Sequence, residues 1–323
     1  MSGKTAQDGG PRATSWAEVV RLRTLPAAVA PVILGSGAAA ATGDLSGVRS
    51  LLAAGVALAL QVGCNLANDY SDGVRGTDDE RTGPPRLTAS GQVAPRTVKL
   101  AAFGCFGLGA LLGLGLLALS GQWWLLVVGA AAIAAAWFYT GGSRPYGYAG
   151  LGELFVFIFF GLVATAGTTY VQADTVPGWL WPSACGIGLL ACSLLMVNNL
   201  RDIDTDPDHG KMTLAVRLGE RGARRAFSAM LYLPLLLGAV ALVWARETGS
   251  ASPADGGGHV SPLLTLVIAL TVPFLLLPLV RRATAPVRAG ARGRDLIGSL
   301  REAGLLELAY GIVFAAATVI ITL

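Results

Sequence analysis

Long apolar stretches recur along almost the whole chain, and they restrict the possible folds more than any other feature of the sequence. A helix needs ~20 mostly apolar residues to cross a hydrocarbon core of ~30 Å. Because backbone polar groups in lipid must be hydrogen-bonded within the protein, an array of such stretches predicts an all-α, polytopic membrane protein. The charged fraction of 14% agrees with this prediction, since soluble domains carry about 25%.

We predict about nine transmembrane helices in a single bundle, with cytoplasmic loops capping the functional site. The polar residues 1–15 are expected to form a flexible cytoplasmic tail, and residues 16–323 a single transmembrane domain. A tight helical hairpin is expected at Ser120-Gly121, where two spans almost touch in sequence. The predicted spans are 25–42, 50–68, 98–119, 122–140, 152–172, 178–199, 224–245, 260–280 and 303–322.

The distribution of basic residues predicts how the chain is oriented in the membrane. If the spans alternate in direction, all of the 24 Lys and Arg residues except Arg49 and Arg246 belong to one side. Positive residues are retained on the cytoplasmic side. We therefore expect a multi-pass protein of the plasma membrane, with a cytoplasmic N-terminus and an external C-terminus. The same distribution explains the net charge of +4 without nucleic-acid binding.

The first predicted cytoplasmic loop begins with a set of amide and carboxylate side chains. Asn65, Asn68, Asp69 and Asp72 follow one another at intervals of three and four residues, which places them on one face of a helix. That helix would leave the second span at the cytoplasmic membrane edge. Further charged residues follow in the loop, namely Arg75, Asp78 and Arg81.

The third predicted cytoplasmic loop carries a second set with similar chemistry. Asn198, Asp202 and Asp206 recur every four residues, and the spacing predicts that they continue one helical face beyond the sixth span. Arg201 and Lys211 are interleaved with these acids. The two sets are therefore expected to meet on the same side of the membrane.

The chemistry of both sets favours a magnesium–diphosphate site. Oxygen ligands without cysteine or histidine suit a hard cation, and Mg²⁺ is often bound by one or two carboxylates together with substrate phosphates. The interleaved basic residues fit a diphosphate bridged by metal ions better than a site for cations alone. A zinc site is not supported, because His209 and His259 stand alone and the four cysteines lie in apolar stretches. The alternative interpretation is that both windows are ordinary loops with helix-capping Asn and Asp.

At these residues the chain resembles the UbiA-type superfamily of intramembrane prenyltransferases. Its members have an Asn-Asp-x-x-Asp motif after the second helix and an Asp-x-x-x-Asp motif after the sixth, which correspond here to 68–72 and 202–206. Other segments resemble the menaquinone branch, the 1,4-dihydroxy-2-naphthoate polyprenyltransferases. These segments are Gly76-x-Asp78, 82–86, 198–202, 210–214 and the loop 139–153.

The resemblance implies Mg²⁺-dependent transfer of a polyprenyl group from a polyprenyl diphosphate to 1,4-dihydroxy-2-naphthoate, with loss of CO₂ and diphosphate. The implied catalytic residues are Asp69, Asp72, Asp202 and Asp206. The implied metal ligands are these four with Asn68, Asp78 and Asn198. Diphosphate contacts are expected from Arg75, Arg81, Arg144, Arg201 and Lys211, and substrate contacts from Asn65, Tyr139 and Tyr146.

Other functions remain open at this point. Within the same superfamily, the acceptor could be 4-hydroxybenzoate, homogentisate or a lipid. A secondary transporter is a different class, but transporters usually place charged residues near the middle of interrupted spans. In this sequence the carboxylates within predicted spans, Glu153 and Glu307, are close to span ends. The lipid bilayer is an expected partner, whereas the sequence leaves the oligomeric state and the prenyl chain length open.

Overall fold

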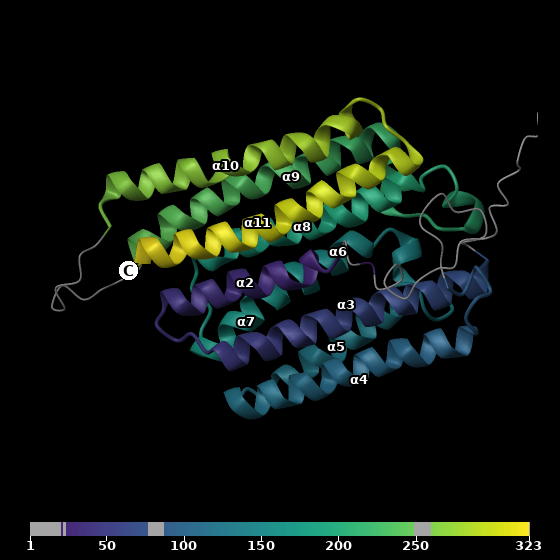
Figure 1. Cartoon of the computed structure of the whole chain (residues 1–323), viewed down its shortest axis with the longest axis horizontal. Helices are drawn as coiled ribbons and strands as arrows, with labels where there is room; N and C mark the ends of the chain where they lie inside the picture. Colours follow the sequence, from purple (N-terminus) through teal and green to yellow (C-terminus); the bar gives the residue numbers. More distant parts are fainter. Residues whose placement is uncertain (1–20, 22–23, 77–86, 249–259, 323) are drawn as a thin grey trace, which may run out of the picture.

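The computed structural model describes residue 21 and residues 24–76, 87–248 and 260–322. Every regular element within these residues is helical, which confirms the all-α prediction. The long helices lie side by side along a common axis (Figure 1). They are α3 (Gly47–Arg75), α4 (Pro95–Ser120), α8 (Leu180–Arg201), α9 (Leu214–Thr248), α10 (Pro262–Arg288) and α11 (Ile297–Thr322).

Several shorter elements complete the bundle. The helices α2 (Pro26–Ala41) and α5 (Leu125–Phe138) are apolar but have 16 and 14 residues. Three elements follow one another without a break, namely α6 (Gly152–Val156), the π-helix η3 (Phe157–Val163) and α7 (Ala164–Ala173). Short 3-10 turns lie in the loops at η2 (Tyr146–Ala149), η4 (Pro207–His209) and η5 (Gly293–Leu296).

Seven helical segments of the described chain are long and apolar enough to cross a membrane. They are α3, α4, the α6–η3–α7 segment, α8, α9, α10 and η5 with α11. Each predicted span lies on a described helix, but α2 and α5 are shorter than this length. The prediction of a polytopic helical protein is therefore confirmed at the level of seven membrane-capable segments.

Residues with well-known capping behaviour set the ends of several helices. The Ser46 side chain accepts a hydrogen bond from the Arg49 amide at the start of α3, and Pro95 occupies the first turn of α4. Gly121 ends α4 in the left-handed conformation with φ of 76°. This conformation is cheap for glycine because it has no Cβ. The tight hairpin predicted at Ser120-Gly121 is thus confirmed.

The helices form two groups on either side of a central pair. In the view of Figure 1, α9, α10 and α11 lie above, α3, α4 and α5 lie below, and α2 and α8 run between them. The largest cluster of buried apolar side chains joins α2 and α8 to α9, α10 and α11. A smaller cluster joins α3 and α4. Consequently, α8 is the most buried of the long helices.

Two local irregularities alter the direction of side chains or backbone. In the π-helix η3, Gly161 packs so closely on α8 that an added Cβ would lie 2.4 Å from the Cα of Gly188. In α9, Gly219 has φ of 67° and ψ of 167°, so a short first arm is separated from the long part of the helix. The predicted span 224–245 lies wholly in that long part.

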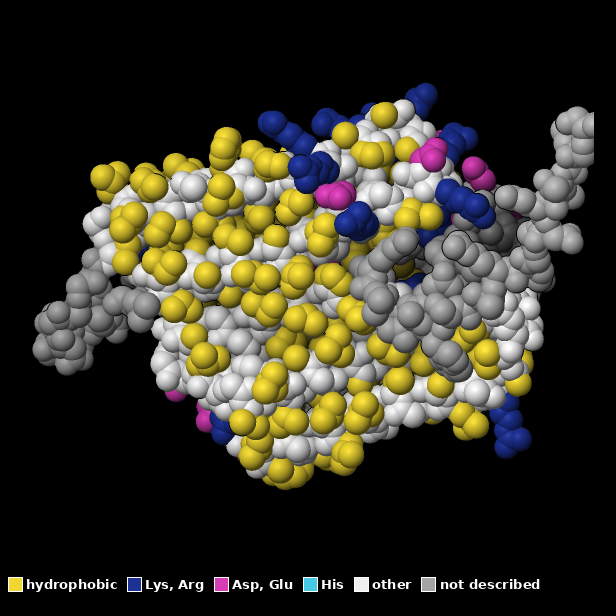
Figure 2. Space-filling model, viewed as in Figure 1, with side chains coloured by type: hydrophobic (Ala, Val, Ile, Leu, Met, Phe, Trp, Pro, Cys, Tyr) yellow, Lys and Arg dark blue, Asp and Glu magenta, His cyan; other side chains and the backbone are white. Residues whose placement is uncertain are grey.

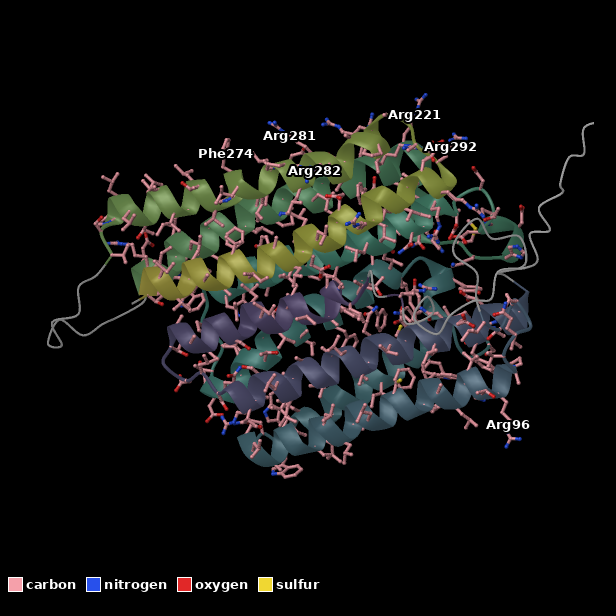
Figure 3. All side chains as sticks on the ribbon, in the orientation of Figure 1. Arg96, Arg221, Phe274, Arg281, Arg282 and Arg292 are labelled. Carbon is pink, nitrogen blue, oxygen red and sulfur yellow. The ribbon has the colours of Figure 1, made fainter. Side chains whose placement is uncertain are left out.

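Much of the visible surface is apolar, as expected for a protein surrounded by lipid. Hydrophobic side chains cover the left and middle of the face shown in Figure 2, while most of the visible Lys and Arg lie toward the right. Arg96, Arg221 and Arg292 are at this right-hand end in Figure 3, and the C-terminus is at the opposite end in Figure 1. The charge segregation expected from the sequence is therefore present in space.

Candidate active site

A chamber of about 550 Å³ lies between the helices of the lower group and the central pair. Its walls come from α2, α3, α4, α5, η3, α7 and α8. One end carries polar side chains from both sequence motifs, and most of the remaining wall is apolar. The motif residues that line the chamber are Asn65, Asn68, Asp72, Asn198, Arg201, Asp202 and Lys211.

The first motif presents three side chains to this chamber from the last turns of α3. The Asp72 carboxylate is 2% exposed, and its Oδ1 accepts a hydrogen bond of 2.8 Å from the Tyr148 hydroxyl. The Oδ1 of Asn68 accepts a hydrogen bond of 2.8 Å from the Thr140 hydroxyl. Asn65 donates to the Thr24 hydroxyl over 3.2 Å. The helical spacing seen in the sequence therefore produces a polar face that neighbouring elements hold in place.

Asp69 has a different environment, although it belongs to the same motif. Its Oδ2 accepts a hydrogen bond of 3.1 Å from the Leu87 amide, and its Oδ1 accepts one of 3.0 Å from the Thr88 amide. The side chain is buried and does not line the chamber. Its contacts attach the segment before α4 to the end of α3.

The Arg75 side chain likewise does not line the chamber and instead binds backbone carbonyls of a neighbouring loop. Its guanidinium donates hydrogen bonds to the backbone carbonyls of Thr140 and Gly142. The same guanidinium lies 5.4 Å from the centre of the Tyr148 ring, and the Lys211 ammonium lies 5.8 Å from the same centre. Tyr148 thus contacts both motifs, because its hydroxyl binds Asp72 and its ring meets Lys211.

The second motif begins on the last turn of α8. Arg201 forms a bidentate pair with Asp202, with Nε to Oδ1 at 2.8 Å and Nη2 to Oδ2 at 2.6 Å. The Nη1 of Arg201 also donates to the Oδ1 of Asn198 over 3.0 Å. Both charged residues are buried. Paired in this way, neither buried charge is left uncompensated.

The prediction that Asp206 continues the helical face of Asn198 and Asp202 is wrong. The helix α8 ends at Arg201, and residues 202–206 form turns before η4. The backbone then reverses so that the Lys211 amide donates to the Asp206 carbonyl over 2.9 Å. The Lys211 ammonium lies 3.5 Å from the Oδ1 of Asp206. Asp206 therefore contacts a chamber residue without lining the chamber itself.

The other predicted site residues have varied positions. Tyr139 and Tyr146 line the chamber with their rings 5.6 Å apart, and their contact with substrate stays a prediction. Burial raises the pKa of Tyr146, so its hydroxyl remains a donor, and it binds the Ala135 carbonyl over 2.8 Å. Arg144 is exposed and does not line the chamber. Asp78 and Arg81 lie outside the described residues.

Some residues of the site were not among the predicted ones. Asn199 lines the chamber and donates to the Glu153 carboxylate over 3.2 Å. Gln61 lines the chamber one turn before Asn65 and donates to the Thr24 hydroxyl over 3.0 Å. Tyr148 also lies outside the predicted set, although it belongs to the loop 139–153. The sequence positions of Asn199 and Gln61 could have indicated both residues, because Asn199 directly follows Asn198 and Gln61 precedes Asn65 by four residues.

The donor set fits magnesium held jointly with a diphosphate. No group of three or more His, Cys, Asp or Glu side chains able to hold a metal occurs within residues 24–76, 87–248 and 260–322. The chamber instead offers the carboxylates of Asp72 and Asp202 and the amide oxygens of Asn68 and Asn198. Such a set agrees with Mg²⁺ bound by one or two carboxylates and completed by substrate phosphates.

Comparison with known proteins assigns a class to this fold and site. The model of the UbiA prenyltransferase family matches residues 28–288. The chain therefore belongs to the UbiA prenyltransferase family and is a multi-pass membrane protein.

Among individual relatives, the chain is 47% identical to the 1,4-dihydroxy-2-naphthoate octaprenyltransferase of Mycobacterium tuberculosis, over 94% of this chain and 96% of the relative. It is 42% identical to the Escherichia coli protein of the same name, over 68% of this chain and 73% of the relative.

Solved structures agree in fold. A UbiA homolog from Archaeoglobus fulgidus bound to DMAPP and Mg²⁺ superposes with a TM-score of 0.60 at 14% identity, covering 95% of this chain and 100% of that one. The apo structure of a UbiA homolog from Aeropyrum pernix has a TM-score of 0.62 at 19% identity, covering 96% and 100% of the two chains. These structures establish the shared helical architecture.

Proposed function

We propose that this protein transfers a polyprenyl group from a polyprenyl diphosphate to 1,4-dihydroxy-2-naphthoate in a Mg²⁺-dependent reaction of menaquinone biosynthesis. The observation that carries the proposal is the meeting of the two motifs at one end of an apolar chamber, with Asp72 from α3 and Asp202 from the end of α8. The relative from Mycobacterium tuberculosis, with 47% identity over nearly both chains, supports the naphthoate as acceptor.

The polar end of the chamber would bind the diphosphate. Asp72, Asp202, Asn68 and Asn198 offer the oxygens that would hold magnesium, which when bound would neutralise charge on the diphosphate. Lys211 lines the chamber and would contact phosphate oxygens directly. Arg201 is the second chamber-lining cation, and its guanidinium would be shared between Asp202 and the diphosphate.

Two of the predicted metal and phosphate ligands are better assigned positioning roles. The bonds of Asp69 to two backbone amides and of Arg75 to two backbone carbonyls occupy these side chains away from the chamber. We infer that Asp69 fixes the loop before α4 and that Arg75 fixes the loop 140–142. These contacts keep Asp72, Thr140 and Tyr148 in register around the diphosphate end.

The apolar wall suits the rest of the reaction. The bond between the prenyl carbon and the diphosphate oxygen breaks, and the leaving group takes the electron pair. The naphthoate ring carbon that bears the carboxylate then forms the new carbon–carbon bond. The bond between this ring carbon and the carboxylate then breaks, CO₂ leaves, and the electron pair of that bond restores the aromatic ring. A chamber wall of Leu, Val, Ala and Phe limits access of water to the allylic cation.

The orientation in the membrane belongs to the same proposal. We propose that the protein lies in the plasma membrane and that residues 16–323 form a single domain. This domain has nine spans, because α2 and α5 also cross the membrane. The diphosphate end of the chamber would face the cytoplasm, covered by the loops that follow α3, α5 and α8. The cations gathered at that end support this orientation (Figure 3).

The direct test is mass spectrometry of the products formed by the purified protein. The protein in detergent is mixed with Mg²⁺, octaprenyl diphosphate and 1,4-dihydroxy-2-naphthoate. The proposal predicts a prenylated naphthalenediol lacking the carboxylate, whose mass identifies acceptor and chain length together. Parallel reactions with 4-hydroxybenzoate and homogentisate should give far less product. Product from either of these acceptors, with none from the naphthoate, would assign the protein to another branch of the family.

A further inference from the structure

Two glycines in the apolar wall of the chamber have no packing reason to be glycine. Gly129 in α5 and Gly167 in α7 both line the chamber, and a Cβ added to either would meet no heavy atom within 4 Å. The close contact of η3 and α8 is different, because a Cβ on Gly161 would lie 2.4 Å from backbone. Glycine inside a helix is less favourable than alanine. The space at Gly129 and Gly167 is therefore not explained by the packing of the helices.

Both glycines lie in regular stripes of residues that face the chamber. On α5 the stripe is Leu125, Gly129 and Ile133, and on α7 and the end of η3 it is Val163, Gly167 and Val171. Residues four apart share one face of a helix. Each glycine is thus the smallest residue of its stripe, with a larger apolar residue on either side.

The position of Gly129 along α5 places this space well away from the diphosphate end. Thr140, which binds Asn68, follows Gly129 by eleven residues, which corresponds to ~16 Å along a helix. Two contacts flank this part of α5, one from η2 and one from α7. The Tyr146 hydroxyl binds the Ala135 carbonyl at one end, and the Trp124 and Tyr170 rings are 5.7 Å apart at the other.

We propose that Gly129 and Gly167 keep open the path of the distal isoprene units of a long prenyl donor, between α5 and α7. This inference rests on the proposed function and adds a specificity-determining site to it. A chamber of about 550 Å³ has the size of a pocket for a drug-sized ligand. With the acceptor and the first isoprene units near the diphosphate end, the distal units of a longer tail would pass the apolar wall at Gly129 and Gly167.

The test compares a short donor and a long donor in variants that fill this space. Turnover is measured with geranyl diphosphate and with octaprenyl diphosphate for Gly129→Phe and Gly167→Phe. The ratio of octaprenyl to geranyl turnover should fall by about tenfold or more, because overfilled apolar sites reject bulk. The matched controls are Gly104→Phe and Gly107→Phe on α4, where a Cβ also meets nothing within 4 Å but the glycines do not line the chamber.

The control variants should keep the wild-type ratio. An unchanged ratio in both chamber variants, or an equal fall in the α4 controls, would overturn the assignment of the tail path. If a Phe variant is not recovered as folded protein, Gly129→Leu and Gly167→Leu provide the same comparison with a smaller side chain. A wild-type protein that uses neither donor with the naphthoate would contradict the proposed function rather than the tail path.

Discussion

Asp69 and Asp72 are separated by less than one turn of α3, yet their carboxylates have different partners. Asp72 faces the chamber and accepts the Tyr148 hydroxyl, whereas both oxygens of Asp69 accept backbone amides of Leu87 and Thr88. A buried carboxylate that accepts two amide hydrogens contributes to stability, since leaving those donors unpaired is costly. The two residues should therefore respond differently to the same substitution.

The substitution Asp69→Asn tests this difference. An amide group offers one acceptor oxygen and places its own donor against the second backbone amide, so we expect a loss of ~1–3 kcal/mol in unfolding free energy. The Mg²⁺ concentration for half-maximal turnover should remain close to wild type. Thermal unfolding in detergent and a Mg²⁺ titration of turnover are the two measurements. A wild-type Tm with a strongly raised Mg²⁺ requirement would instead make Asp69 a metal ligand.

At this scale, sequence spacing predicts the chamber-facing residues of α3 well but not their partners. Asn65, Asn68 and Asp72 line the chamber as their spacing indicates. Asp69 shares the spacing, but its partners come from a loop 18 and 19 residues away. Arg144 was predicted from a loop motif, and nothing in a local pattern reveals that the side chain is exposed.

At the scale of single elements, the π-helix η3 matters most for the chamber. It interrupts the run from α6 to α7, and Phe159, Phe160 and Val163 from this turn line the apolar wall. π-helical turns occur often at functional sites, because the wider turn changes the direction of the side chains that follow. Close packing of Gly161 on Gly188 holds this turn against α8.

The substitution Gly161→Ala should therefore destabilise the protein. The new Cβ would meet the backbone of Gly188 at 2.4 Å, and backbone in the centre of the bundle cannot move aside cheaply. We expect a loss of ~1–3 kcal/mol, measured as a lower Tm in detergent. Gly104→Ala on the exposed side of α4 is the control, and its Tm should be unchanged or slightly higher. Equal Tm values for both variants would contradict the packing explanation.

The sequence predicts the existence and order of the helices but not their irregularities. Apolar length is a strong signal, and each predicted span lies on a described helix. The π-turn gives no signal, because its residues are as apolar as those of an α-helix. The end of α8 at Arg201 was also missed, since the four-residue spacing of Asn198, Asp202 and Asp206 imitates a helix that the backbone does not continue.

At the scale of the whole molecule, charged and apolar surfaces are separated along the length of the bundle. The loops that carry most of the cations gather at one end, and the C-terminus is at the other (Figures 1 and 3). This arrangement was predictable from sequence, because it depends on which loops carry the Lys and Arg residues and not on tertiary contacts. The length of α2 and α5 was not, since the apolar stretches extend beyond the helices.

The orientation can be tested with single cysteines in intact cells. In a chain whose four native cysteines are replaced, Ser143→Cys and Ser261→Cys place a thiol at an exposed site in the loop after α5 and in the one before α10. A membrane-impermeant maleimide should label the cysteine at 261 in intact cells. The cysteine at 143 should react only after the membrane is opened. The reverse labelling pattern would invert the proposed topology.

The central claim is that Asp72 and Asp202 act together on one diphosphate, and a double-mutant cycle tests it most directly. Diphosphate release with saturating Mg²⁺ is measured for Asp72→Asn, Asp202→Asn and the double variant, with the exposed Asp204→Asn as control. Each single variant should lose about 100-fold or more, and the double variant should lose little beyond that, because groups that act as a unit are not additive. Near-wild-type release in either single variant, or losses that multiply in the double variant, would contradict the claim.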